Sequence, residues 1–244
     1  MDVRFSQSAE PLPHGPLELY FENEGEIIEL SPDRGGLPAG SPAPDAFSGN
    51  APLTQSPMAA YVEKGWLNRI HDDECGHDAI TATYIPGDII NLDTLVEAEP
   101  IGRICALNAA RMKVIPVPML RAAMEADFAL TINVIQRLVA EADWLREALS
   151  AMGRLDAKGR IIYYFGQMRR RQIAYGTLDR QTARYPMPIT QRHLATMVGI
   201  SVIHANRLTK ELRETGLLTL RAKTISLLDI DAFEKAFAAL IPPG

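Results

Sequence analysis

The segment ITQRHLATMVGISVIHANRLTKELRETGLL, residues 189–218, decides the fold of the C-terminal part of the chain. Thr190 can cap a short helix by accepting a backbone N–H bond, and Gly199 permits the positive φ of a sharp turn after that helix. Ser201 can cap a second helix, which Gly216 ends. The positions expected to pack the two helices together are small or apolar: Leu194, Ala195, Val198, Ala205, Leu208 and Leu212. This order of caps, turn and packing positions predicts a helix-turn-helix.

The residues on either side extend this unit. A helix is expected near residues 155–175, upstream of the helix-turn-helix. Downstream, LLTL and TISLLDI form two expected strands joined by the basic turn Arg221–Ala222–Lys223. A hairpin directly after the second helix is the wing of a winged helix-turn-helix. Asp231 is expected to cap a last helix, AFEKAFAAL.

A narrow apolar stripe begins at Phe128. Its steps alternate between three and four residues over more than three heptads, which is typical of a coiled coil. The stripe has one polar member, Thr131, and runs through Phe128, Ile135, Leu138, Ala142, Leu145, Leu149 and Met152. We expect a second copy of the chain to cover it, the alternative being that the helix packs against its own domain. Gly153 is expected to end the helix and to act as a hinge.

The N-terminal half has the pattern of an all-β domain. Two short strands are expected within residues 17–30, followed by an insert at 31–57 that is rich in proline and glycine. Strands resume with a hairpin, AAYVEKGWLNRI and AITATYI, which Pro86–Gly87–Asp88 closes; IGRICAL and ARMKVIPV follow. Short strands at regular spacing indicate an antiparallel roll or barrel.

These segments predict an α+β chain of three parts. The first is an N-terminal antiparallel β-roll over residues 1–117, including the insert. A dimerisation helix over 118–153 follows, and a winged helix-turn-helix covers 154–244.

Composition limits the functions open to this chain. Its 244 residues favour two domains, and it has no apolar run long enough for a membrane span. Two cysteines are too few for a disulfide framework, and no secretory signal opens the chain, so a cytoplasmic location is expected. Net charge is −13 over residues 1–153 but +8 over residues 154–244, which suits a protein that offers one end to a polyanion. Without a phosphate loop, nucleophile elbow or metalloprotease motif, the sequence does not indicate an enzyme.

The sequence resembles the Crp/Fnr family of bacterial transcription regulators over roughly residues 17–240. The strongest similarity is the segment 189–218, with its Thr-Gln-x-x-Leu-Ala start, its turn glycine and its Leu-x-x-Gly-Leu end. In the N-terminal half, Gly65 and the Pro86–Gly87–Asp88 turn match the family. The resemblance implies a cyclic-nucleotide-binding-like jelly roll, a dimerisation helix and a DNA-binding winged helix-turn-helix.

The same resemblance implies roles for individual residues. The second helix would enter the major groove, with base-reading candidates Ser201, Val202, His204, Asn206 and Arg207. Arg207 matches the family's helix arginine and suits guanine, Asn206 suits adenine, and Val202 suits a thymine methyl group. Phosphate contacts are expected from Thr190, Gln191, Arg192, Lys210, Arg221 and Lys223. A dimer would read an inverted repeat in double-stranded DNA, gated by an effector at the β-roll, with RNA polymerase as a further partner.

No cofactor is expected. Cyclic-AMP-binding relatives carry a Gly-Glu pair and an Arg-Ser/Thr pair, but the matching positions here lie near Asn91, Leu92, Ile101 and Gly102, and Arg103 is followed by Ile104. An iron–sulfur cluster needs about four thiolates, against two cysteines in this chain. Cys75, His77 and nearby His71 suggest a metal or haem site, although an ordinary solvated turn accounts for them better.

A different class of function stays open at this point. The chain could be a ligand-binding or protein-interaction module whose helix-turn-helix does not bind DNA. Steep salt dependence would distinguish a DNA-binding protein from such a module, because phosphate contacts release counterions.

Overall fold

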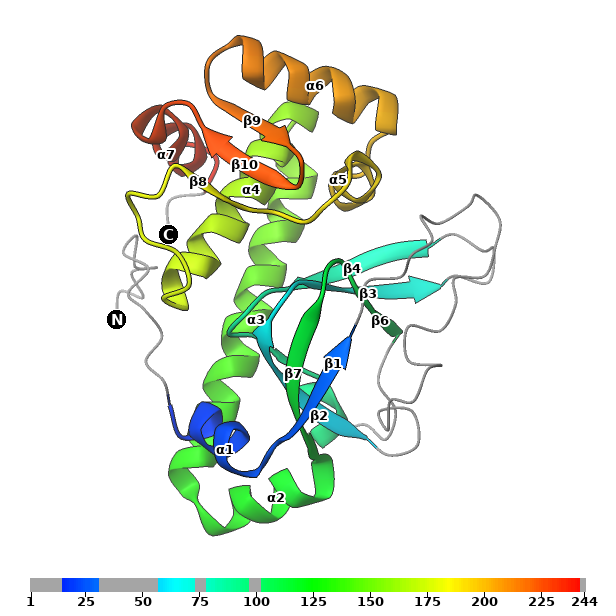
Figure 1. The fold of residues 1–244 in the computed structure, drawn as a ribbon, viewed down its shortest axis with the longest axis vertical. Helices are drawn as coiled ribbons and strands as arrows, with labels where there is room; N and C mark the ends of the chain where they lie inside the picture. Colours follow the sequence, from blue (N-terminus) through cyan, green and yellow to red (C-terminus); the bar gives the residue numbers. More distant parts are fainter. Residues whose placement is uncertain (1–14, 31–56, 73–77, 97–101, 242–244) are drawn as a thin grey trace. The chain divides into compact units, whose positions relative to one another are not determined.

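The computed structural model describes residues 15–30, 57–72, 78–96 and 102–241. The chain forms two compact units, and the boundary between them falls within helix α3, after Glu141. Most of the insert at 31–57, together with Cys75, His77 and Ile101, lies outside the described residues. The fold is of the mixed class expected, with antiparallel sheets first and a helix-turn-helix last (Figure 1).

The N-terminal unit is built on two antiparallel sheets (Figure 1). The four-stranded sheet has the order β1-β7-β2-β5, and the three-stranded sheet has the order β4-β3-β6. The strands are β1 (Glu26–Leu30), β2 (Met58–Lys64), β3 (Leu67–Asp72), β4 (Asp78–Tyr84), β5 (Ile89–Ile90), β6 (Arg103–Ala106) and β7 (Ala110–Pro116). The expected hairpin is therefore formed by β3 and β4, while β2 turns away at Gly65 (φ 87°) to pair with β5 and β7.

Alternation along β2 and β7 divides the N-terminal core in two. Ala60 pairs with Val114, and both contribute to the cluster that also contains residues of the second sheet. One residue along, Ala59 pairs with Ile115, and these side chains point to the opposite face of the sheet. There they pack with residues of α1 (Pro16–Glu24), the 3-10 helix η2 (Leu92–Leu95), α2 (Val117–Ala126) and the first turns of α3 (Phe128–Arg154).

The prediction of two strands within residues 17–30 is wrong for the first half of this segment, which forms helix α1. Pro16 occupies the first helical turn, where its missing N–H costs nothing, and the Glu18 carboxylate accepts the Gly15 N–H at 2.8 Å. Leu17 and Phe21, four residues apart, are fully buried on one face of the helix. Burial of this face outweighs the strand-forming composition of the segment. Only β1 is a strand.

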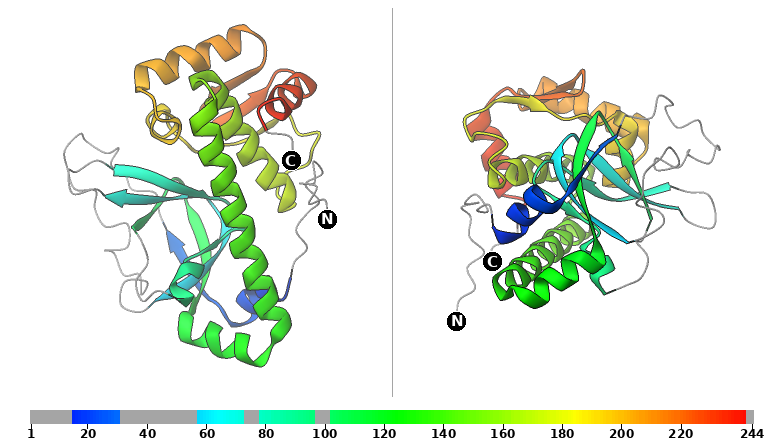
Figure 2. Two further views of the ribbon diagram at one scale, coloured as in Figure 1. Left: turned by 180° about the vertical axis from the view of Figure 1, so that it is seen from behind. Right: turned by 60° about the horizontal axis from the view of Figure 1, so that its bottom comes forward.

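The C-terminal unit consists of the end of α3 and a winged helix-turn-helix (Figures 1 and 2). Its helices are α4 (Ala157–Ala174), α5 (Gln191–Val198), α6 (Val202–Glu214) and α7 (Ile230–Ala238), and its strands are β8 (Arg184–Pro186), β9 (Leu218–Arg221) and β10 (Thr224–Leu227). The wing hairpin β9–β10 gains a third strand, β8, for which the sequence pattern gave no indication. Asp231 is not the cap of α7: the Asp229 carboxylate accepts the Ala232 N–H at 2.9 Å, so the helix begins earlier than expected.

The last turns of α3 pack against α4 through side-chain contacts. The Arg171 guanidinium lies 4.7 Å from the centre of the Trp144 ring. The Glu147 carboxylate accepts hydrogen bonds from Gln167 Nε2 at 2.6 Å and from Arg170 Nη2 at 2.5 Å. This segment of α3 is therefore part of the C-terminal unit in packing as well as in sequence.

Candidate nucleic-acid interface

The helix-turn-helix is set by local capping and by close helix packing. Thr190 Oγ1 accepts the His193 N–H at 3.1 Å, and Ser201 Oγ accepts the His204 N–H at 3.2 Å, so both helices begin where the sequence predicts. Gly199 adopts φ 67° and ψ 42°, the left-handed conformation that a residue without Cβ tolerates best. The six predicted packing positions of α5 and α6 are all buried.

Helix α6 turns a continuous face toward solvent. Ser201, Val202, Asn206 and Arg207 are exposed, and His204 is half-buried. The Arg207 guanidinium donates to His204 Nε2 at 3.0 Å, so these two side chains are held together on the surface. The face also includes Ile203, which is 83% exposed and which the sequence analysis did not select. The signal for it was available, because Ile203 is a large apolar residue in the first turn, off the buried stripe of α6.

The candidate phosphate contacts differ in how they are presented. Thr190, Arg192 and Lys210 are exposed, and so are Arg221 and Lys223 in the wing turn. Gln191 is the exception: its side chain turns toward α6, where Nε2 donates to Thr209 Oγ1 at 3.4 Å.

His193 lies near two of the candidate phosphate contacts, Arg192 and Lys223. Burial lowers the pKa of His193 from its ordinary value, and the positive charges of Lys223 and Arg192 lower it further. The wing turn and the start of α5 therefore bring positive charge to one region of the unit. Such a region favours an anionic ligand.

The exposed stripe of α3 differs in phase from the predicted one. Phe128, Ile135, Leu145 and Leu149 are exposed as the stripe requires, and Ala142 is half-buried. Leu138 instead packs partly against the N-terminal core, whereas Ile132 and Val139, which lie outside the predicted stripe, are exposed.

Met152, the last member of the predicted stripe, is half-buried and turned toward the helix-turn-helix. A Cβ at Gly199 would lie 3.1 Å from the Met152 methyl carbon.

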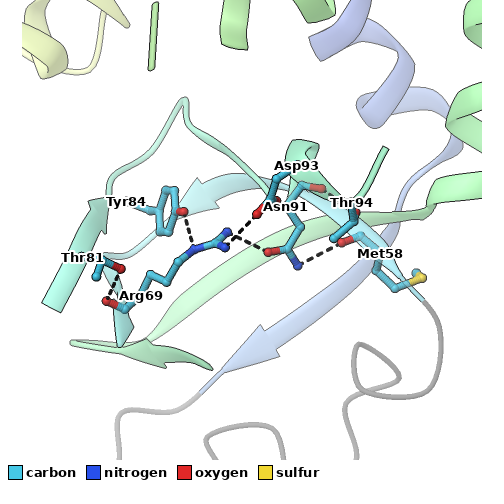
Figure 3. A network of polar contacts seen from close by, with 7 residues as sticks. All are labelled: Met58, Arg69, Thr81, Tyr84, Asn91, Asp93 and Thr94. Atoms are coloured by element: carbon cyan, nitrogen blue, oxygen red, sulfur yellow. Dashed lines mark hydrogen bonds and ion pairs between the residues drawn. The ribbon is translucent and has the colours of Figure 1, made fainter. Parts of the chain in front are cut away.

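The interior of the β-roll contains a polar network centred on Arg69 (Figure 3). Its guanidinium donates to Tyr84 Oη at 2.8 Å, to Asn91 Oδ1 at 2.9 Å and to Asp93 Oδ2 at 3.2 Å. Asn91 in turn donates to the Met58 carbonyl at 3.1 Å. The network joins β3, β4 and η2 through the buried side chains of Arg69 and Tyr84 and the partly exposed carboxylate of Asp93.

The residues at the positions that matter for cyclic AMP do not fit that ligand. Asn91 belongs to the Arg69 network, and Leu92 is buried in the apolar core. The Arg103 guanidinium donates to Cys105 Sγ at 3.2 Å. The residue that follows Arg103 is Ile104, which has no hydroxyl group. The described residues contain no group of three or more histidine, cysteine or acidic side chains able to hold a metal ion. Within the same residues, no helix is long and apolar enough to cross a membrane.

Comparison with known proteins agrees with this geometry. Residues 159–236 match the model of the Crp-like helix-turn-helix domain. The regulatory protein HlyX of Actinobacillus pleuropneumoniae is 19% identical over 170 residues, which cover 70% of each chain. The anaerobic regulatory protein of Haemophilus influenzae is also 19% identical over 170 residues, covering 70% of this chain and 65% of that protein.

Solved structures show the same fold over most of the chain. FixK2 from Bradyrhizobium japonicum superposes with a TM-score of 0.67 at 17% identity, covering 87% of this chain and 96% of that one. A CooA mutant from Carboxydothermus hydrogenoformans gives a TM-score of 0.63 at 15% identity, covering 93% and 97%. The fold and the exposed second helix define a winged helix-turn-helix protein of the DNA-binding class. More narrowly, residues 159–236 form a Crp-like helix-turn-helix domain, and the chain is similar over about 70% of its length to transcription regulators such as HlyX.

Proposed function

We propose that this regulator binds DNA as a dimer and reads an inverted repeat in the major groove through α6. The carrying observation is the exposed face of α6, where Arg207 stands clear of the protein core one turn from the helix start. A guanidinium fork can bond both O6 and N7 of guanine. Arg192, Lys210, Arg221 and Lys223 would neutralise phosphates around this contact.

The test is selection of bound sequences from a random DNA duplex pool with the full chain. Wild type should enrich an inverted repeat whose half-sites lie about one helical turn apart. Arg207→Ala should lose preference at one guanine in each half-site, a cost of about 1–3 kcal/mol. Lys210→Ala is the matched control, because loss of a phosphate contact should weaken binding to all sequences alike. A pool left unenriched by wild type at low salt would contradict the proposal.

The dimer is proposed from the apolar surface of α3. Phe128, Ile132, Ile135, Val139, Leu145 and Leu149 are large apolar side chains exposed on one helix. Successive members are three or four residues apart except for the six-residue step from Val139 to Leu145, where the stripe shifts around the helix; covering such an apolar surface is a common cause of helix pairing. Leu145→Glu should therefore give a monomer in analytical ultracentrifugation and abolish inverted-repeat binding. Leu19→Glu, at an exposed leucine outside α3, is the control that should remain dimeric.

Signal transmission is proposed to pivot upstream of Trp144 rather than at Gly153. The residues on both sides of Gly153 make contacts within the C-terminal unit: Met152 lies beside Gly199, and Arg154 donates to the Leu240 carbonyl at 3.1 Å. A pivot at Gly153 would break the contact of Met152 together with those of Glu147, and only the Arg154 bond, which lies wholly after Gly153, would survive. A pivot upstream would leave them intact.

A further inference from the structure

Two exposed β-branched side chains stand in the first turn of α6. Ile203 is 83% exposed and Val202 is 40% exposed. Among the described residues from 157 to 241, Leu228 is the one other large apolar side chain that is exposed to this extent. The first turn of α6 is therefore the principal apolar spot on a surface that is otherwise mostly polar.

Folding does not account for this placement. The helix is already held by the Ser201 cap and by its buried residues Ala205, Leu208 and Leu212. Isoleucine and valine are only moderate helix formers, and an exposed side chain gains no burial. The two residues thus cost the free protein some solubility and contribute little to its packing.

The surroundings of the pair point to nucleic acid as the surface that covers it. Asn206, Arg207 and Lys210 follow on the same helix, and all three are exposed. A stable protein interface needs about 800 Å² from each partner, far more than two side chains supply. The major groove, by contrast, offers one isolated apolar group, the C5-methyl group of thymine.

We infer that Ile203, together with Val202, reads thymine methyl groups in the half-site, a role that rests on the proposed DNA-binding function. Ile203 precedes Arg207 by one helical turn, about 6 Å along the helix. The thymine should therefore lie within about two or three base pairs of the guanine that Arg207 contacts. Specificity would come from one charged contact and one apolar contact, and the apolar contact requires A·T pairs beneath the helix start.

The test uses the inverted repeat obtained by selection with wild type. Each thymine of the half-site is replaced in turn by deoxyuridine, which removes the C5-methyl group and leaves base pairing unchanged. Wild type should lose about fourfold in affinity for each contacted methyl group. At one or more of these thymines, Ile203→Ala should bind the thymine and deoxyuridine duplexes with nearly equal affinity, while any thymine that Val202 contacts should still be discriminated. Leu228→Ala, the matched exposed-apolar control, should discriminate between them as wild type does.

The outcomes separate this inference from the function on which it rests. Failure of wild type to enrich any sequence would overturn the DNA-binding proposal itself. Enrichment of an inverted repeat that tolerates deoxyuridine at every position would overturn only thymine reading. Discrimination that persists at every thymine in Ile203→Ala would overturn the role assigned to Ile203. Because Ile203 supports no packing, Ile203→Ala should fold like wild type, and its circular dichroism spectrum checks this.

Discussion

Replacing Arg169 by methionine should destabilise the C-terminal unit by about 1–3 kcal/mol. Arg169 is 1% exposed. Its guanidinium donates to the carbonyls of Arg180 and Thr182 at 2.5 and 2.7 Å, and to Glu234 Oε1 at 2.8 Å. A methionine of similar length would fill the space but leave both carbonyls without their donor. A polar group left unsatisfied costs about 1–3 kcal/mol when it is buried; Thr182 is half-buried and Arg180 is exposed, so the two carbonyls together should cost about that much.

Tryptophan fluorescence during urea unfolding can measure this loss in the full chain. The sequence has two tryptophans; Trp66 lies in the N-terminal unit, so Trp66→Phe leaves Trp144 to report on the C-terminal unit. In that background Glu234→Gln is the control, because its half-exposed carboxylate should contribute less than about 1 kcal/mol. Arg169→Lys should fall between the two variants, since an ammonium lacks the planar fork that reaches several acceptors. A cost below about 1 kcal/mol for Arg169→Met would refute the reasoning, because it would show that the bonds of the buried guanidinium contribute nothing to the stability of the unit.

Three further predictions concern single residues of the C-terminal unit. A Cβ at Gly166 would overlap the ring of Phe237, so Gly166→Ala should cost about 1–3 kcal/mol in the same urea assay, and an unchanged midpoint would contradict the close packing of α4 on α7. His193 has a lowered pKa in the folded state, so the unfolded chain binds its proton more tightly; the stability that this residue contributes is present above about pH 6.5 and is lost as the pH falls below that value. Thermal melts from pH 7.5 to 5 should therefore fall less steeply for His193→Gln than for wild type, and parallel curves would show that another group is responsible. Nothing lies within 4 Å of a Cβ at Gly153, so Gly153→Ala should stabilise α3 by about 0.5–1 kcal/mol and leave DNA affinity unchanged, whereas a large change in affinity would restore Gly153 as the hinge.

The helix-turn-helix could be predicted from sequence because its signals are local. Thr190 and Ser201 each accept a backbone N–H three residues away, and Gly199 supplies the turn by its own conformation. None of these features depends on the rest of the fold. The basic wing turn could be predicted from its place between two strand-like segments, although Ala222 and Lys223, which both adopt positive φ, are not residues that favour such a turn.

The missed elements depend on contacts between distant residues. Helix α1 has a strand-like composition, and its helical form depends on burial against α3, where Glu18 pairs with Arg137. Strand β8 has three residues and exists because Tyr185 pairs with Ile225 across the wing sheet. No window of sequence around either segment contains its partner, so local patterns favoured other interpretations.

The phase of the α3 stripe could not be settled from sequence for a different reason. The first turns of this helix have apolar residues on two faces. One face, with Leu130 and Val134, is buried in the N-terminal core, and the other, with Ile132 and Val139, is exposed. The predicted heptad pattern includes residues of both faces, and it therefore takes in Leu138, which belongs to the buried face. Which face is buried depends on where the β-sheet packs against the helix, and the sequence of the helix does not contain this information.

The attachment of the end of α3 to α4 has a practical consequence for isolating the DNA-binding part. A fragment that starts after Arg154, where the linear order of domains suggests a cut, would lack Trp144 and Glu147. It would leave Arg170 and Gln167 without the carboxylate that they share. Expression of residues 142–244 keeps these contacts, and we expect only this longer fragment to be a well-folded, proteolysis-resistant monomer suited to half-site binding experiments.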